Sequence, residues 1–292
     1  MASYIFVVDE DNFGVCVERG VCGCPRYENP RINARAIADV AGIRPGARVG
    51  FYVKGVGIYG FFRAKQHAFY DETPIWRNSD QVFPYRVLIE ATDTTLEKPI
   101  ALSDLYDLAD KDILWSWRGI VQRDCHPFTS MESLEILRLL HRSNPWTFSR
   151  QWITNPYTPQ DPRPLPICLE ADASGRVVTK GGPEASLMAW LLREFSEGKH
   201  REIFGNYSDY VNYVPTSFGK EMDILLLHET PDETLRLLTS CTIVELKVGK
   251  CETKDLSQIL KYEDWLIKKK CSGDSAMVRS IIVAHSFDSS VT

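Results

Sequence analysis

The sequence predicts two domains of mixed α and β structure, with a small β-barrel in the first half and an α/β unit in the second. Residues 43–91 hold several short apolar strands separated by glycine turns, which is typical of a barrel. Residues 181–287 instead follow the order helix, strand, strand, helix, strand. Between the halves, residues 155–166 contain five prolines, which neither a helix nor a central strand tolerates.

We place the first domain at residues 1–143, a proline-rich linker at 144–170 and the second domain at 171–292, because 292 residues are enough for two hydrophobic cores. The amphipathic segment "SMESLEILRLLHRSNP" predicts a helix that closes the first domain. Ser130 is expected to cap this helix, which must end near Asn144 because a proline follows.

The composition is that of an ordinary globular protein, with 44% hydrophobic residues, 25% charged residues and a net charge of −5. The apolar runs are shorter than a bilayer span, so we expect no membrane-spanning helix and no membrane partner. The N-terminal "MASYIFVVDEDNF" lacks the basic start of a signal peptide, which favours a cytoplasmic location. The acidic balance argues against a general nucleic-acid coat protein but allows a local basic groove.

Eight cysteines are spread along the chain, too sparsely for a disulfide scaffold. Cys16, Cys22 and Cys24 invite a zinc interpretation, which Cys125 and His126 would complete. Their spacing is not the usual pair of closely spaced ligands followed by a second pair. Reduced, structural thiols are therefore the favoured interpretation, and metal binding by the cluster is left open.

A pair of charged residues marks the strand "TIVELKVGK". Alternation along a strand places Glu245 and Lys247 on one face, with Leu246 on the other. Asp223 lies on the preceding strand, "FGKEMDILLLHE", where its carboxylate can converge with that of Glu245. Mg²⁺ accepts two carboxylates, a backbone carbonyl, which we assign to Leu246, and a phosphate oxygen. Lys247 would reach the attacking water or the scissile phosphate, so the pattern predicts hydrolysis of a phosphodiester.

An exposed Glu-Lys pair on an ordinary strand is the alternative, because the E-x-K pattern is common. Two further features favour the catalytic interpretation. Glu184 stands in the first turn of the preceding helix, "GGPEASLMAWLLREFSEG". Gln258 and Tyr262 lie four residues apart on the following helix and so share one face.

At these residues the sequence resembles the PD-(D/E)xK nuclease superfamily, and is most similar to its NucS-like and restriction-type branch. The resemblance covers residues 180–285, where "PEASLMAWLLREF", "FGKEMDILLL", "TIVELKVGK" and "DLSQILKYEDWL" appear in the order of that branch. Met222 replaces the proline that gives the superfamily its name, and Tyr262 is equally compatible with a core tyrosine. The resemblance implies a C-terminal nuclease fold.

The same resemblance implies roles for five residues. Asp223 and Glu245 would bind Mg²⁺, which Mn²⁺ would be able to replace, and Lys247 would assist catalysis. Glu184 would support the water molecules at the metal, and Gln258 would hold the active site or the DNA strand.

The region from Lys247 to Lys270 carries seven lysines and four acidic residues, a net charge of +3 in an acidic protein. Such a patch can follow a phosphate backbone, and we expect Lys250, Lys254 and Lys261 to contact it. A solvated helix face is the alternative.

Aromatic residues cluster in the first half, and alternate members are expected in the barrel core. The stretches "IFVVDEDNF", "IRPGARVGFYVKG", "GIYGFFRAKQHAFYDETPIW" and "FPYRVLIEA" resemble an EVE domain, a PUA-like barrel related to the YTH and ASCH modules, over residues 1–142. This resemblance implies a pocket that stacks one modified, flipped-out base between aromatic side chains. Carried over by position, the pocket residues are Asn12, Phe13, Cys22, Gly23, Tyr52 and Trp76.

Cys22 stands where relatives often have a tryptophan, so the identity of the base is left open. Together the two halves predict a modification-dependent DNA endonuclease that cuts double-stranded DNA, such as phage DNA, with methylated or hydroxymethylated cytosine. A nuclease for mismatched, branched or damaged DNA is one alternative, and a non-catalytic RNA-binding protein is another. Double-strand cleavage needs two active sites, which a homodimer would supply.

Overall fold

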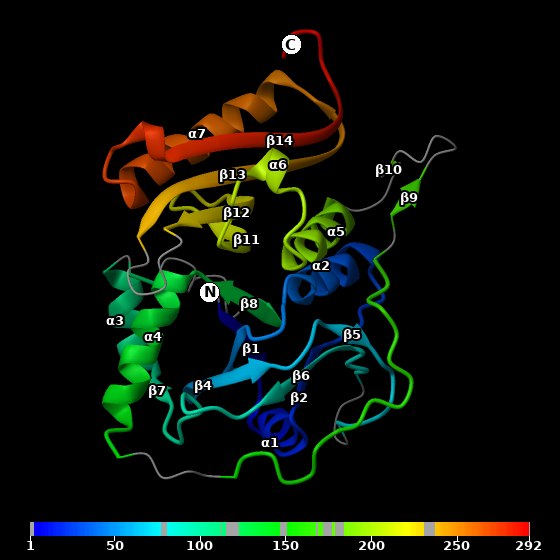
Figure 1. Ribbon diagram of the computed structural model, residues 1–292, viewed down its shortest axis with the longest axis vertical. Helices are drawn as coiled ribbons and strands as arrows, with labels where there is room; N and C mark the ends of the chain where they lie inside the picture. Colours follow the sequence, from blue (N-terminus) through cyan, green and yellow to red (C-terminus); the bar gives the residue numbers. More distant parts are fainter. Residues whose placement is uncertain are drawn as a thin grey trace. The chain divides into compact units, whose positions relative to one another are not determined.

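The structure is a computed structural model that describes residues 3–76, 81–111, 113–114, 123–146, 151–167, 169–171, 177–178, 184–230 and 237–291. The chain divides into two compact units, Met1–Pro166 and Ile167–Thr292, and both are of mixed α and β structure (Figure 1). No helix in these ranges is long and apolar enough to cross a bilayer.

The first unit is built on a curled sheet in the order β2-β6-β4-β3-β1-β8 (Figure 1). β1 pairs with β3 in parallel, and the other neighbours are antiparallel. The predicted barrel is thus a half-barrel along this path, with two short strands attached at its side. The strands are β1 (Ser3–Val8), β2 (Val21–Cys24), β3 (Arg48–Val53), β4 (Gly57–Ala64), β5 (Phe69–Tyr70), β6 (Tyr85–Glu90), β7 (Ile100–Ala101) and β8 (Cys125–Phe128).

Four described helices accompany this sheet. They are α1 (Glu10–Arg19), α2 (Pro30–Ala41), α3 (Leu102–Asp110) and α4 (Ser130–Ser143). α1 follows β1 directly, because Asp9 accepts the backbone N–H of Asn12 as an N-cap. The cap of α4 is Thr129 rather than Ser130, since Thr129 forms a capping box with Glu132. The predicted end of α4 near Asn144 is confirmed.

The proline-rich segment differs from the linker that the sequence predicts. Residues 151–166 belong to the first unit, where the side chains of Trp152, Tyr157 and Leu165 are buried. The backbone of Arg163 pairs with that of Tyr70 as an isolated bridge. The prolines keep the segment extended, and the apolar residues between them give it a face that the first unit buries.

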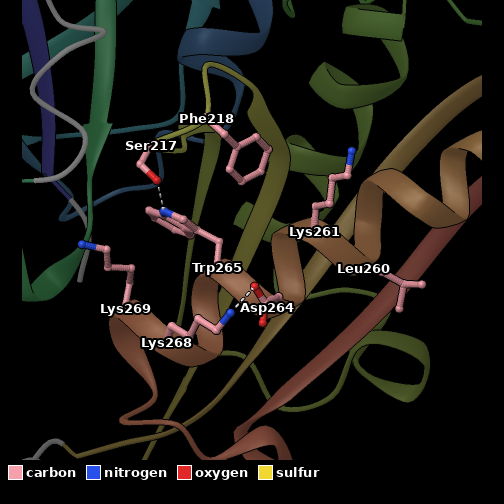
Figure 2. Close-up of a pocket in the computed structure, with 8 residues that line it drawn as sticks. All are labelled: Ser217, Phe218, Leu260, Lys261, Asp264, Trp265, Lys268 and Lys269. Atoms are coloured by element: carbon pink, nitrogen blue, oxygen red, sulfur yellow. Dashed lines mark hydrogen bonds and ion pairs between the residues drawn. The ribbon is translucent and has the colours of Figure 1, made fainter.

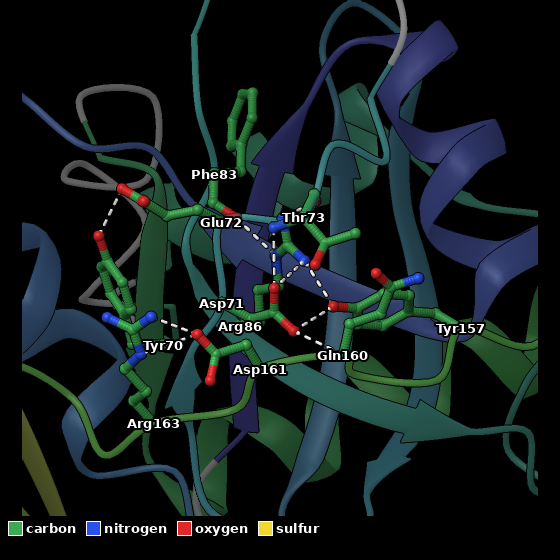
Figure 3. A network of polar contacts seen from close by, with 10 residues as sticks. All are labelled: Tyr70, Asp71, Glu72, Thr73, Phe83, Arg86, Tyr157, Gln160, Asp161 and Arg163. Carbon is green, nitrogen blue, oxygen red and sulfur yellow. Dashed lines mark hydrogen bonds and ion pairs between the residues drawn. The ribbon is translucent and has the colours of Figure 1, made fainter.

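A buried ionic network fastens this segment (Figure 3). The side chains of Arg86 and Asp71 are each 1% exposed and lie 3.6 Å apart. The Tyr157 hydroxyl donates to Asp71 Oδ2 at 2.6 Å and accepts from Arg86 Nη1 at 2.7 Å. Arg86 also donates to the carbonyls of Phe83, at 2.8 Å, and Thr73. Every charged group in the network therefore has partners, as a buried ion pair requires.

The second unit has a four-stranded sheet in the order β11-β12-β13-β14 (Figure 1). The strands are β11 (Asp209–Pro215), β12 (Glu221–Glu229), β13 (Leu238–Cys251) and β14 (Val278–Phe287), with a separate small pair, β9 (Glu170–Ala171) and β10 (Val177–Val178). The helices are α5 (Glu184–Ser196), α6 (Arg201–Phe204) and α7 (Thr253–Lys270), with the 3₁₀ turn η2 (Ser275–Met277). The five predicted elements correspond to α5, β12, β13, α7 and β14 in that order, whereas the sequence analysis missed β11, the short helix α6, the turn η2 and the pair β9 and β10.

Parallel and antiparallel pairing meet at β13. β12 pairs with β13 in antiparallel orientation, whereas β14 pairs with it in parallel after α7. The first half of β13 is therefore paired with a strand on each side, whereas its second half is paired with β14 only. The candidate catalytic residues lie where this change occurs.

Candidate functional site

The sheet places two carboxylates side by side. The last pair of the β12–β13 ladder is Ile224 with Val244, so Asp223 and Glu245 occupy the next opposing positions and share one face. Beyond that pair the strands are joined differently, because the backbone N–H of Leu246 donates to Asp223 Oδ2 at 2.7 Å. The pairing of β12 with β11 also skips the position of Asp223.

Glu245 is the centre of a hydrogen-bonded cluster. Its side chain is 1% exposed, and Oε1 accepts from Lys247 Nζ at 2.8 Å and from Gln258 Nε2 at 2.7 Å. Gln258 also donates to the Tyr262 hydroxyl at 2.8 Å, which in turn donates to the carbonyl of Glu221 at 2.7 Å. Among the described residues, the buried Glu245 Oε2 has no hydrogen-bond partner. This oxygen is therefore available to a ligand.

Three carboxylates, those of Asp223, Glu245 and Glu184, lie near a single lysine, Lys247. Burial raises the pKa of Asp223 to about 8, and the charge of Glu245 adds to the rise, whereas the Leu246 N–H opposes it. Burial likewise raises the pKa of Glu245 and of Glu184, the first residue of α5, against the opposing charge of Lys247. Burial acts to lower the pKa of Lys247, but its bond to Glu245 and the nearby carboxylates raise it overall. A further cation would relieve this crowding.

The candidate ligands are of the type that Mg²⁺ prefers, but they are few. Two oxygen ligands from carboxylates, one of them unpartnered, are what Mg²⁺ commonly takes from a protein while it keeps several waters. In the ranges that the structure describes, no group of three or more His, Cys, Asp or Glu side chains is arranged to hold a metal ion. Two carboxylates alone would leave most positions around such an ion to water or other ligands. The Leu246 carbonyl as a ligand stays a prediction.

The lysines predicted to contact DNA lie around α7. Lys250 Nζ pairs with Asp288 at 2.5 Å, and Lys254 Nζ pairs with Glu252 at 2.8 Å. The two lysine side chains are 51% and 76% exposed, and exposed ion pairs contribute little stability, so a phosphate can replace either carboxylate. Lys261 is exposed on α7 itself.

The predicted base-pocket residues at the start of the chain lie on α1. Asn12 donates from its side chain to Asp9 at 2.9 Å. The Phe13 ring stacks on Tyr59 at 4.6 Å and meets Phe51 edge-on at 5.5 Å. Phe13 therefore packs largely against the aromatic residues of the sheet.

The other predicted pocket residues lie on β3, on β2 and beside Phe83. Tyr52 of β3 belongs to the core cluster that contains Phe61 and residues of α3 and α4. Cys22 and Gly23 lie in β2, and Cys22 is fully buried. Trp76 is 9% exposed, with its ring 5.0 Å from that of Phe83. The Arg86 guanidinium lies 5.3 Å from the Trp76 ring.

Cys16 links two of these positions, because it is hydrogen-bonded to Trp76 and lies close enough to Cys22 for an electrostatic effect. Burial raises the pKa of Cys16 to about 12 and raises the pKa of Cys22, Cys24 and Cys125 well above its usual value. In the described part of the chain these side chains are not arranged as a group that could hold a metal ion, so the alternative of a zinc site gains no support.

Sequence reasoning missed an aromatic pair in the second unit. Phe218 lies in the tight turn between β11 and β12, and Trp265 lies on α7; both line a surface groove. The signal in the sequence was the aromatic residue inside "TSFGKE", a polar turn in which an apolar side chain has no core to enter.

Comparison with known proteins finds weakly similar solved structures but no family. No family model and no curated protein matches the chain. Similar solved structures include a hypothetical protein from Leishmania major (14% identity, 49% of this chain, 97% of that chain, TM-score 0.36). Rpa0253 from Rhodopseudomonas palustris is 19% identical, with 49% of this chain and 94% of that chain covered and a TM-score of 0.34. Atu2648 from Agrobacterium tumefaciens is 15% identical, with 55% of this chain and 100% of that chain covered and a TM-score of 0.31. Likeness at these TM-scores carries no argument about function.

Proposed function

We propose that the protein is a modification-dependent DNA endonuclease. In this proposal the second unit is a PD-(D/E)xK-type nuclease that hydrolyses phosphodiesters with Mg²⁺ or Mn²⁺. The first unit is an EVE-type, PUA-like module that reads a methylated or hydroxymethylated cytosine in double-stranded DNA. The observation that carries the proposal is the cluster of Asp223, Glu245, Lys247 and Gln258, which hydrogen bonds hold at one point of the sheet.

Each residue of the cluster has a task in hydrolysis. Asp223 and Glu245 would hold the cation, which supplies charge neutralisation at the phosphate and activation of water. Gln258 and Lys247 both bind Glu245 Oε1, which fixes the carboxylate and leaves Oε2 for the cation. Lys247 Nζ also brings a positive charge to the position where negative charge develops on the phosphate. Glu184, at the start of α5, would orient water.

Lys247→Ala is expected to slow cleavage by roughly 100-fold or more at saturating Mg²⁺, because one donor to the developing charge is lost. The Mg²⁺ concentration that gives half-maximal rate should change much less, since both carboxylates stay. Rates measured across a Mg²⁺ titration check this, with Lys247→Arg as a variant that keeps the charge. A wild-type rate for Lys247→Ala would remove Lys247 from the mechanism.

The proposal as a whole is tested by digesting one DNA sequence in unmodified, methylated and hydroxymethylated forms, with Mg²⁺ and with EDTA. Metal-dependent cleavage of a modified form alone is the expected result. Equal cleavage of all three forms would contradict base reading, and preferential cleavage of mismatched or branched DNA would favour the structure-specific alternative. Binding of modified RNA without cleavage of any DNA would favour the non-catalytic one.

Trp76→Ala is expected to weaken binding to DNA with the cognate modified base by roughly 1–3 kcal/mol, the usual contribution of one stacking contact. Binding to unmodified DNA should change little, because it depends mainly on phosphate contacts. Titrations with both DNAs check the loss of preference. Trp76 packs against Phe83, so Phe83→Ala, which disturbs the same packing, serves as the control in parallel thermal melts. Equal preference for modified DNA in Trp76→Ala and the wild type would exclude Trp76 as a pocket wall.

A further inference from the structure

A surface groove of about 480 Å³ lies between α7 and the turn that joins β11 to β12 (Figure 2). The turn contributes Ser217 and Phe218. The helix contributes Leu260, Trp265 and three lysines. Aromatic, aliphatic and cationic side chains thus line one hollow, which is unusual for a surface that only meets water.

The aromatic part of the groove is held in place rather than loosely exposed. The Trp265 indole N–H donates to Ser217 Oγ at 3.0 Å, which fastens the turn to α7 (Figure 2). The Phe218 ring lies nearly parallel to that of Tyr262, at 5.8 Å with 23° between the planes. Phe218 is nevertheless 43% exposed. An aromatic ring supported on one side and open on the other is a platform on which a planar group can stack.

The charged part of the groove is positive. Lys261, Lys268 and Lys269 line it together with one acid, Asp264, which pairs with Lys268 at 2.6 Å. Lys261 and Lys269 are eight positions apart, which is about 12 Å along a helix. The charges therefore complement a short run of phosphates.

The platform is connected to the candidate catalytic cluster. Tyr262, which supports Phe218, accepts a hydrogen bond from Gln258, and Gln258 also donates to Glu245. Three side chains of α7 and its neighbours thus lead from the groove to the carboxylate at the centre of the site. A change at the Phe218 platform can therefore reach the carboxylate of Glu245 through these contacts.

We propose that this groove binds an unpaired segment of the DNA strand next to the bond that is cleaved. Phe218 stacks on a base, and Lys261 and Lys269 contact the phosphates. The proposal rests on the proposed nuclease function, and it adds that a duplex opens beside the cut. Stacking needs an exposed base face, which a paired strand does not offer to a surface side chain.

The experiment measures binding without catalysis, with the full chain in EDTA and a short fluorescein-labelled oligo(dT) followed by anisotropy. Phe218→Ala is expected to raise Kd roughly fivefold or more, the effect of one lost stacking contact. Phe218→Leu, which keeps an apolar side chain but loses the ring face, should weaken binding nearly as much. Lys261→Ala should weaken binding and reduce the steepness of its salt dependence.

Two variants serve as matched controls. Trp146→Ala removes an aromatic side chain that is 84% exposed in the first unit. Lys199→Ala removes a lysine whose side chain is 50% exposed elsewhere in the second unit. Both should bind oligo(dT) within about twofold of the wild type, the range expected when no stacking or phosphate contact is lost.

Wild-type affinity in Phe218→Ala and Phe218→Leu would overturn the proposal, as would binding of oligo(rU) without binding of oligo(dT). If Phe218→Ala melts earlier than the wild type, Phe218→Leu and Lys261→Ala decide the result. Digestion of methylated and hydroxymethylated duplex DNA by the wild type in Mg²⁺ tests the nuclease separately. Binding that depends on Phe218 without any cleavage would leave the groove intact and reject the nuclease.

Discussion

Glu245→Gln and Asp223→Asn are each expected to abolish metal-dependent DNA cleavage while DNA binding stays nearly intact. Each change removes a charged oxygen ligand and keeps the volume of the side chain. At Glu245 the change removes the negative charge that binds Lys247 and Gln258. It also replaces the carboxylate, whose Oε2 has no partner among the described residues, by an amide. Cleavage of modified DNA and binding in EDTA, measured for both variants, check the prediction.

The stability of these variants adds a second measurement. Burial and the charge of Glu245 raise the pKa of Asp223 to about 8, so ionisation of this group opposes folding at neutral pH. Asp223→Asn is therefore expected to melt at the same temperature as the wild type or higher. Replacing a functional residue that is destabilised in the folded protein often raises stability. Glu202→Gln, at a side chain that is 73% exposed, is the control and should change neither cleavage nor melting. Unchanged cleavage by Asp223→Asn or Glu245→Gln would remove the catalytic assignment.

The contacts within one strand or one helix of the candidate site could be predicted from the sequence. The alternation of a strand places Glu245 and Lys247 on one face, and the structure joins them by a hydrogen bond. The helical spacing of Gln258 and Tyr262 places them together, and they too are bonded. The contact between Gln258 and Glu245 depends on how α7 packs on the sheet, which no local pattern specifies.

The parts that the sequence did not predict depend on caps and on distant contacts. The sequence analysis did not predict α1, whose start depends on the cap that a single aspartate, Asp9, provides. The proline-rich segment was predicted as a linker because prolines exclude helices and strands. Its place in the first unit depends instead on Tyr157, which bonds to Asp71 at a separation of 86 residues. The only indication of that contact in the sequence is an aromatic residue, Tyr157, between two prolines.

Arg86→Met is expected to lower the free energy of unfolding of the protein by about 3–5 kcal/mol, because it leaves the buried carboxylate of Asp71 without its cation. The same change removes the donors to the carbonyls of Phe83 and Thr73 and to the Tyr157 hydroxyl (Figure 3). Denaturation in urea, followed by tryptophan fluorescence, measures the loss. Arg138→Met is the control, because the Arg138 side chain is 57% exposed and its ion pair with Glu135 should contribute at most about 1 kcal/mol.

The pH dependence separates a lost ion pair from lost packing. Burial alone would raise the pKa of Asp71, but hydrogen bonds from Thr73 and Tyr157 and the charge of Arg86 hold it well below its usual range. In the wild type, Asp71 therefore contributes stability above its unfolded pKa of about 4, and that stability is lost as the pH falls through the lower folded pKa. Without Arg86 the buried carboxylate is raised in pKa, and protonation relieves it. The difference in stability between wild type and Arg86→Met should thus shrink on acidification, and the double variant Asp71→Asn, Arg86→Met should recover part of the loss at neutral pH. A difference that stays constant with pH would mean that packing, rather than the ion pair, holds the proline-rich segment in place.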